Sequence, residues 1–463
     1  MAKHLEIVKL FKNIFSTLQL AFTLFLTVLI GGNIAHAATL DDALRASLAN
    51  SAELSAARQG WISARENIGV SSSTSDLSGT VNITGNQTHT DTNTSSGFEQ
   101  SQYASAAITI SKNLYDGGQT AENTKLANYN LDVASAGYSN TEQGLILQTI
   151  EAYLGVVKAQ REVSLHADNL ARLESHVKAA EARVRAGAAT PTRVAESKAR
   201  FARAQSDAIA AAANLQNAED KLHSLTGIEL RDLLLPAALS SLPDTLIEAE
   251  NIARAEHPSI REAIANELSA SQQFNTLAAS VKPTVSLSLS ASTKDKTGTV
   301  ADQDVMSAQI VFSSPFISTN ATRAKSRSVS ASHAQSKFAR DEAIRSVDVD
   351  LRSAYRNVNT TKIRLDAVTS ELEATRLVSR GIVSEVTFGQ KTILDQLDAE
   401  QDVNAAELRL VTAEHDVILA SYRLKAAMGR LSAVNLGLGD VLPKLNDLPS
   451  PDTFINGIFS DKK

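Results

Sequence analysis

Two long stretches of the chain carry apolar residues at the alternating three-and-four spacing of a coiled-coil helix. They run from Gly118 to Ala186 and from Thr319 to Phe388, and each would be about 100 Å long if continuous. Neither contains proline, which costs about 3 kcal/mol inside a helix. We therefore predict two uninterrupted helices, which could pack as a simple antiparallel bundle or as the wall of a wider tunnel. The predicted seam residues are Val156, Ala159, Val163, His166, Leu170, Leu173, Val177, Ala180 and Val184 in the first, and Leu365, Val368, Leu372, Thr375, Ser379, Ile382 and Val386 in the second.

Four shorter runs alternate apolar and polar residues with the period of two that is typical of a β-strand. The clearest is "VKPTVSLSLSAST", in which Val285, Leu287 and Leu289 alternate with serines. This pattern predicts strands with one apolar and one hydroxylated face. The other runs begin at Gly79, Gln102 and Val305, and the polar segments Gln87–Gln100 and Lys294–Asp304 are predicted to be solvated loops.

The order of these patterns occurs twice along the chain. A helical segment, at residues 40–70 or 246–279, precedes two strands, a long helix, a glycine-marked turn and a second helix. The segment from Leu40 aligns with the segment from Leu246, and residues at the later turns align as well, which indicates an internal duplication. The aligned pairs are Gly187 with Gly389, Thr190 with Thr392 and Gly227 with Gly429, all offset by 202 residues.

The duplication divides the chain into five predicted parts. Residues 1–37 combine early lysines, an apolar stretch and Ala35-His36-Ala37, the pattern of a secretory signal peptide. That stretch is shorter than the roughly 20 residues that span a bilayer. We expect a first repeat at 38–227, a linker at 228–245, a second repeat at 246–429, and a C-terminal tail at 430–463 that returns to a belt around the helices near the linker.

Four strands in an exported chain raise the question of where the sheet edges go. About eight strands are needed to close a barrel, and an open edge cannot be satisfied in lipid. Several copies could pool their strands into one membrane barrel. The alternative is a soluble sandwich with one wet face.

Composition and motif content exclude several classes of partner and site. The chain has a net charge of −6 and no cysteine, so we expect no nucleic-acid partner, no disulfide and no thiolate metal site. The nine histidines form no HExxH motif, and no GxSxG or phosphate-loop sequence occurs. We expect neither an enzyme nor a cofactor.

Two aspartates near the second turn are the strongest functional candidates. In "GQKTILDQLDAE", Gly389–Glu400, Thr392 is placed to cap a helix and Asp395 to complete a capping box. Asp398 lies one turn deeper, where capping does not explain it. With Asp402, these residues form an acidic stripe, for which a solvated face is the default interpretation.

The duplicated order and three motifs resemble the TolC family of outer-membrane efflux and secretion channels. The motifs are "LYDGG" (114–118), "RAGAATPTRVAESKAR" (185–200) and "GQKTILDQLDAE" (389–400). The resemblance implies an α plus membrane-β fold, in which long antiparallel coiled-coil helices form a periplasmic α-barrel and four strands from each of three chains form one 12-stranded outer-membrane β-barrel.

The resemblance also implies a function and partners. The homotrimer would be the passive exit duct of a tripartite efflux pump or a type I secretion system, gated at its periplasmic tip. Its partners would be outer-membrane lipid, a periplasmic adaptor protein and an inner-membrane transporter of the RND or ABC type. A periplasmic structural or adaptor protein with a soluble β domain is the alternative, in which the apolar strand face would meet protein instead of lipid.

Residue roles follow from the same motifs. Asp395 and Asp398 would project into the lumen as stacked rings, Lys391 and Thr192 match residues that latch the closed tip, and the Gly187 and Gly389 turns would dock the adaptor.

Two latch positions depart from the family pattern. Val386 stands where some members have tyrosine, and Arg193 stands where many have aspartate. We hypothesise that Arg193 instead pairs with the aspartates of the neighbouring helix pair.

Overall fold

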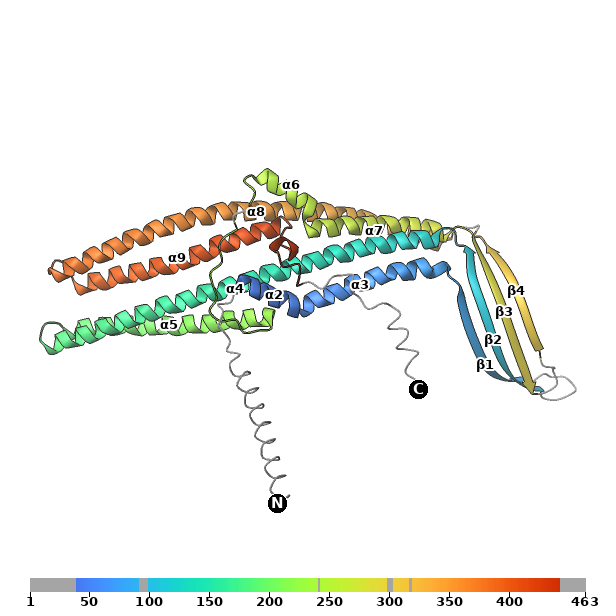
Figure 1. Cartoon of the computed structure of the whole chain (residues 1–463), viewed down its shortest axis with the longest axis horizontal. Helices are drawn as coiled ribbons and strands as arrows, with labels where there is room; N and C mark the ends of the chain where they lie inside the picture. The colour runs from blue at the N-terminus through green and yellow to red at the C-terminus, as the bar shows by residue number, and fades with distance from the viewer. Residues whose placement is uncertain (1–38, 91–98, 240–241, 298–302, 316–318, 442–463) are drawn as a thin grey trace, which may run out of the picture.

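The chain is elongated, with a β-sheet at one end and two helical hairpin tips at the other (Figure 1). The computed structural model describes residues 39–90, 99–239, 242–297, 303–315 and 319–441. The predicted signal peptide and most of the predicted C-terminal tail lie outside these ranges.

The element order repeats, as the sequence predicted: two helices, two strands, a long helix and a shorter helix. The first set is α2 (Leu40–Asn50), α3 (Ala52–Ser72), β1 (Ser78–Thr90), β2 (Glu99–Tyr115), α4 (Gln119–Arg185) and α5 (Pro191–Thr226). The second set is α6 (Leu246–Glu256), α7 (Pro258–Ser280), β3 (Thr284–Thr297), β4 (Gln303–Ser313), α8 (Asn320–Thr387) and α9 (Ile393–Ala427), and short 3₁₀ turns lie at Ser73–Ser75 (η1) and Val434–Leu436 (η2).

The first helical segment of each half is two helices, where the sequence predicted one. Ser51 ends α2 in an extended conformation, and its side chain then accepts a hydrogen bond from Leu54 N–H to cap α3. In the second half His257 breaks the helix in the same way, because Pro258 disfavours helical backbone in the residue before it and begins α7 instead.

The four strands form one antiparallel sheet in the order β1-β2-β3-β4. Ladder pairing continues to Thr90 opposite Glu99 and to Lys294 opposite Gln303, so the predicted loops at 87–100 and 294–304 begin later than expected. Backbone groups pair across a hairpin whatever the polarity of the side chains. Residues 295–297 also belong to β3 and pair with β2, and the parts of the predicted loops at 91–98 and 298–302 lie outside the described residues.

The sheet has one apolar and one hydroxylated face, as predicted. Directly opposed residues share a face, and the row Val81, Ile108, Ala291 and Met306 is apolar. On the other face Ser290 Oγ lies 2.7 Å from Ser307 Oγ. The apolar face includes Val81, Ile83, Ile108, Ile110, Leu289, Met306, Ile310 and Phe312, all exposed to solvent in the single chain.

The long helices fold back as two antiparallel hairpins, α4 with α5 and α8 with α9 (Figure 1). The predicted seams are confirmed: Val156, Val368 and Leu372 are buried, and the other apolar seam residues are at least half-buried. In the described ranges no helix combines the length and the apolar composition that crossing a bilayer requires.

The main core lies at mid-length and includes both the linker and the first part of the tail. Leu233 of the linker and Leu431 of the tail are buried with Leu44 and Tyr153. Tyr153 Oη donates to Leu234 O at 2.7 Å and accepts from Leu234 N–H at 3.1 Å. The buried carboxylate of Glu142 accepts from a tail amide, Ala433 N–H, at 2.6 Å.

A candidate gate at the hairpin tips

The two hairpins turn with the same backbone geometry. Gly187 and Gly389 have φ values of +74° and +75°, in the left-handed region that glycine adopts without steric cost. Ala188 N–H donates to Arg183 O at 2.8 Å in the first turn, and Gln390 N–H donates to Glu385 O at 2.9 Å in the second. These are the bonds of a Schellman motif, and they occur at positions 202 residues apart.

The helices that follow the turns begin differently. Thr392 and Asp395 form the predicted capping box: Asp395 Oδ2 accepts from Thr392 N–H at 2.8 Å, and Asp395 N–H donates to Thr392 Oγ1 at 3.3 Å. Thr190 makes no side-chain cap bond. Arg193, which occupies the position equivalent to Asp395, cannot accept the bond that a carboxylate accepts.

The capping box keeps Asp395 ionised. Hydrogen bonds from the backbone and the hydroxyl of Thr392 lower the pKa of this carboxyl and outweigh the opposing effect of burial, and the charges of Lys391 and Arg193 make smaller contributions in the same direction. Arg193 is therefore close enough to Asp395 to act on it electrostatically, although no ion pair joins them in the described structure. Thr192 forms no side-chain hydrogen bond to the second hairpin in those ranges.

Asp398 has a partner that the sequence did not predict. Arg200 Nη2 of α5 lies 2.6 Å from Asp398 Oδ1 of α9, and Arg200 Nη1 donates to Gln401 Oε1 at 3.0 Å. The contact therefore ties the first hairpin to the second near their tips. The duplication offered one indication of this contact. Arg200 in the first half is equivalent to Asp402 in the second half, so the two hairpins carry opposite charges at equivalent positions.

Three further contacts connect α4 with α9 between the middle of the molecule and the tips. Glu151 pairs with Arg423 at 2.7 Å, Arg161 pairs with Glu414, and His176 Nε2 lies 3.0 Å from Glu400 Oε2. The residue numbers of each pair sum to nearly the same value, as expected for two antiparallel helices in constant register. Together with Arg200 and Asp398, these contacts make the two hairpins of one chain a single unit.

The two tips carry opposite charge. Residues 181–203 include six basic and two acidic side chains, whereas the equivalent residues 383–405 include one basic and five acidic side chains. The net charges are therefore +4 and −4.

A cavity of about 930 Å³ separates the two tips. Arg183, Arg193 and Lys391 contribute cationic side chains to its wall, and Val386 contributes an apolar one. The predicted latch residues Arg193 and Lys391 thus face the same space from different hairpins, while Thr192 does not line it.

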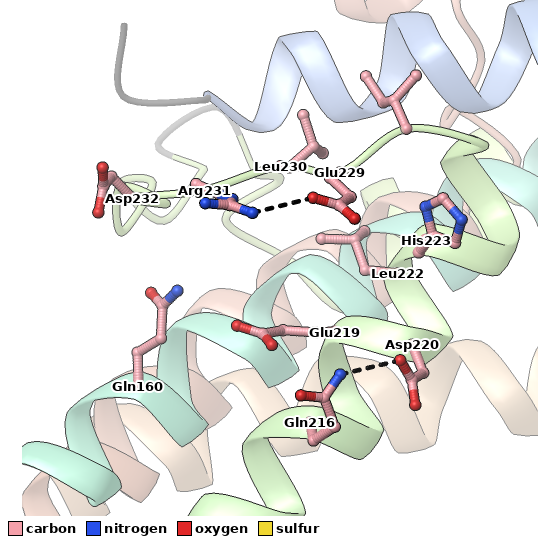
Figure 2. A pocket seen from close by; sticks show the side chains of 11 residues that line it. Gln160, Gln216, Glu219, Asp220, Leu222, His223, Glu229, Leu230, Arg231 and Asp232 are labelled. Carbon is pink, nitrogen blue, oxygen red and sulfur yellow. Dashed lines mark hydrogen bonds and ion pairs between the residues drawn. The ribbon is translucent and has the colours of Figure 1, made fainter. Parts of the chain in front are cut away.

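A second cavity, of about 480 Å³, lies between α4, α5 and the linker, far from the tips (Figure 2). It is polar, and Figure 2 shows Arg231 paired with Glu229 and Gln216 with Asp220. Its acids and His223 are not grouped as metal ligands, and no cluster of three metal-ligating side chains occurs in the ranges that the structure describes.

Comparisons with known proteins find relatives along most of the chain. The family model described as "Outer membrane efflux protein" matches residues 43–228 and 250–430. The outer membrane efflux protein BepC of Brucella suis is 30% identical over 412 residues, which cover 88% of this chain and 89% of the relative. The outer membrane protein TolC of Vibrio cholerae is 23% identical over 366 residues, covering 73% and 81%.

Solved structures share the fold. The Campylobacter jejuni CmeC outer membrane channel superposes with a TM-score of 0.75 at 13% identity, covering 89% of this chain and 90% of that one.

Proposed function

Because the chain belongs to the outer membrane efflux protein family, we propose that three copies assemble into one continuous duct from the outer membrane to a gated periplasmic tip. The chain itself is an outer-membrane efflux channel that extends into the periplasm, and it is not an enzyme. The trimer, its gate residues and its partners are the proposal.

The sheet supports pooling of strands. Its edge strands β1 and β4 each have one unpaired side, and one face is apolar while the other is hydroxylated. In three copies, four strands each give twelve, so that β4 of one copy can pair with β1 of the next. The apolar face would then meet lipid and the hydroxylated face would line the lumen.

A closed ring of helical hairpins is supported by pairs of equivalent residues, one from each half of the chain, of which one is buried and the other exposed. Val411 of α9 is buried in the single chain at 4% exposure, whereas its equivalent on α5, Ile209, is 65% exposed. Leu147 of α4 packs on the core, whereas its equivalent on α8, Val349, is 64% exposed. Within a chain α4 and α9 cover each other, whereas the equivalent faces of α8 and α5 stay exposed.

These exposed faces fit each other in a second copy. If α8 of one copy packs on α5 of the next as α4 packs on α9 within a chain, the duplicated hairpins form a ring of six. Burial of exposed apolar residues stabilises such contacts by about 25 cal/mol per Å².

The gate lies at the tips of this ring. Asp395 and Asp398 would each occur three times around the axis, and Lys391, Arg193 and Thr192 would adjust the closed state. Like charges about 8 Å apart repel by about 0.5 kcal/mol at the dielectric of water and about 2 kcal/mol at an effective dielectric of 20, so the closed tip requires countercharges.

The partners are a periplasmic adaptor, docked at the Gly187 and Gly389 turns, and an inner-membrane transporter of the RND or ABC type. The duct is passive and needs no cofactor. Its parts are the signal peptide at 1–37, the repeats at 38–227 and 246–429, the linker at 228–245 and the tail at 430–463.

A photo-crosslinking amino acid at Gln390, on the second turn, tests this arrangement in cells. We expect an adduct with a periplasmic protein that contains a helical hairpin, identified by mass spectrometry, and none from the same group at Gln160 near the belt. Outer-membrane extracts should contain a trimer that dissociates on heating. A monomer in the soluble periplasmic fraction would contradict the trimer, and adducts at both positions or neither would contradict adaptor docking at the tip.

A further inference from the structure

The duplication relates each contact between the two hairpins of one chain to a contact between neighbouring copies. Residues 187 and 227 align with 389 and 429 without a gap. In the ring proposed above, on which this inference rests, the rotation that carries hairpin α4–α5 onto hairpin α8–α9 also carries α9 onto α5 of the next copy. A pair between α5 and α9 in one chain thus has an equivalent between α9 and α5 of its neighbour.

At the tip, this rotation turns the attractive contact between Arg200 and Asp398 into a repulsive pair of like charges. Arg200 is replaced by Asp402, and Asp398 is replaced by Glu196 of the neighbouring copy. Both acids are exposed, and neither has a hydrogen-bond or ion-pair partner in the described ranges. We propose that the periplasmic tip opens first between copies and only afterwards within a chain, because Asp402 of one copy opposes Glu196 of the next where Arg200 binds Asp398 inside the chain.

Farther from the tip the same operation gives an attractive junction. The α4 residues Arg161 and His176, which bind α9 within the chain, correspond on α8 to Ile363 and Val378. These two apolar side chains are 70% and 57% exposed in the single chain. On α5 the facing side offers Ile209, also exposed. Within the chain Arg161 and His176 bind Glu414 and Glu400, which correspond to Ala212 and Lys198 of the neighbouring copy. The ion pairs are therefore replaced by an apolar contact at Ile363 and by the aliphatic stem of Lys198 at Val378, without opposed charges.

The two kinds of junction give the tip a defined direction of movement. Within a chain, ionic contacts join the hairpins from Glu151 and Arg423 to Arg200 and Asp398. Between copies the junction is largely apolar along the shaft and ends in opposed carboxylates. The three junctions between copies then part first, and the three contacts within chains break only in the fully open tip.

Disulfide crosslinking can identify the seam, because the natural chain has no cysteine. The double variant Glu196→Cys/Asp402→Cys should form covalent dimers and trimers on mild oxidation, and its channels should close in planar lipid bilayers and recover on reduction. Arg200→Cys/Asp398→Cys should consume its thiols at monomer mass. Monomer-mass crosslinking, or free thiols, in the first variant would overturn the proposal.

A single substitution tests the energetics. Asp402→Arg introduces the residue found at the equivalent position of the first half. It should replace the repulsion between Asp402 and Glu196 of the neighbouring copy with an ion pair. We expect the ratio of closed to open time to rise by about tenfold, which is about 0.5 kcal/mol at each of three junctions. Asp402→Asn should give a smaller rise. Arg409→Gln is the control, since it breaks a 2.6 Å pair with Glu371 inside one hairpin.

The outcomes separate this inference from the function it rests on. If the wild-type protein forms no channels, the proposed gated duct fails, whereas crosslinking still reports which residues face each other. If the wild-type protein conducts and Asp402→Arg conducts identically, the opposed-carboxylate seam is wrong.

Discussion

Arg200→Gln is the substitution that most directly perturbs the contact between the two tips of one chain. It removes the charge that binds Asp398 and one of the donors to Gln401, while it retains a side chain that can hydrogen-bond. Arg200 is 27% exposed and Asp398 is 56% exposed, so solvent screens the pair and it contributes on the order of 0.5 kcal/mol.

Three copies multiply the effect. A loss of about 1.5 kcal/mol across the ring corresponds to about a tenfold increase in the ratio of open to closed time. Single-channel recording in planar bilayers measures this ratio directly. Raising the salt concentration should reduce the difference between wild-type and variant channels, because the Debye length falls from about 10 Å at 0.1 M to about 3 Å at 1 M.

The control is again Arg409→Gln, whose ion pair is as short but does not cross between hairpins. The charge-swapped variant Arg200→Asp/Asp398→Arg should restore part of the wild-type closed time. If Arg200→Gln leaves the open-to-closed ratio unchanged at low salt, the contact does not contribute to closure and the reasoning is wrong.

Three further predictions concern stability, each followed by thermal unfolding in detergent. A Cβ at Gly429 would lie 2.4 Å from a backbone atom of the link between α6 and α7, whereas a Cβ at Gly389 meets open space. Gly389→Ala should lower the free energy of unfolding by about 1 kcal/mol because of its positive φ, and Gly429→Ala should lower it clearly more. Equal losses in the two variants would contradict the structure. Burial raises the pKa of Glu142, although its hydrogen bond from a tail amide lowers it in part. The folded state therefore favours the protonated acid. The stability that Glu142 contributes in its protonated form is lost as pH rises through the raised pKa. Glu142→Gln should therefore be more stable than wild type at neutral pH but not in acid. Tyr153→Phe leaves two linker backbone groups without their partner and should cost about 1–3 kcal/mol, with faster limited proteolysis in the linker; an unchanged melting temperature would count against that role.

Much of the fold could be predicted because its elements are long and regular. Proline-free stretches with a seven-residue repeat specify the long helices regardless of their neighbours, and serine-apolar alternation specifies β3. The break before Pro258 was also readable, since proline disfavours helical backbone in the preceding residue. The break at Ser51 was not, because serine is tolerated within helices and becomes a cap only when the chain turns there.

The contacts at the tip were harder to predict. The capping box of Asp395 is local, so the spacing of three residues between Thr392 and Asp395 was enough to identify it. The pairing of Arg200 with Asp398 depends on how one hairpin is rotated against the other, which packing of α4 on α9 determines. Within the single chain Arg193 acts on Asp395 without an ion pair, because its position at the start of α5 places it across the cavity between the tips. Its pairing with the aspartates of a neighbouring helix pair stays a prediction.

The reversal potential of single channels under a potassium chloride gradient tests the proposed gate most directly. The purified wild-type trimer should be cation-selective, and Asp395→Asn/Asp398→Asn should lose most of that selectivity while it still conducts. Selectivity that is unchanged in the double variant would contradict the assignment of the gate to these two aspartates.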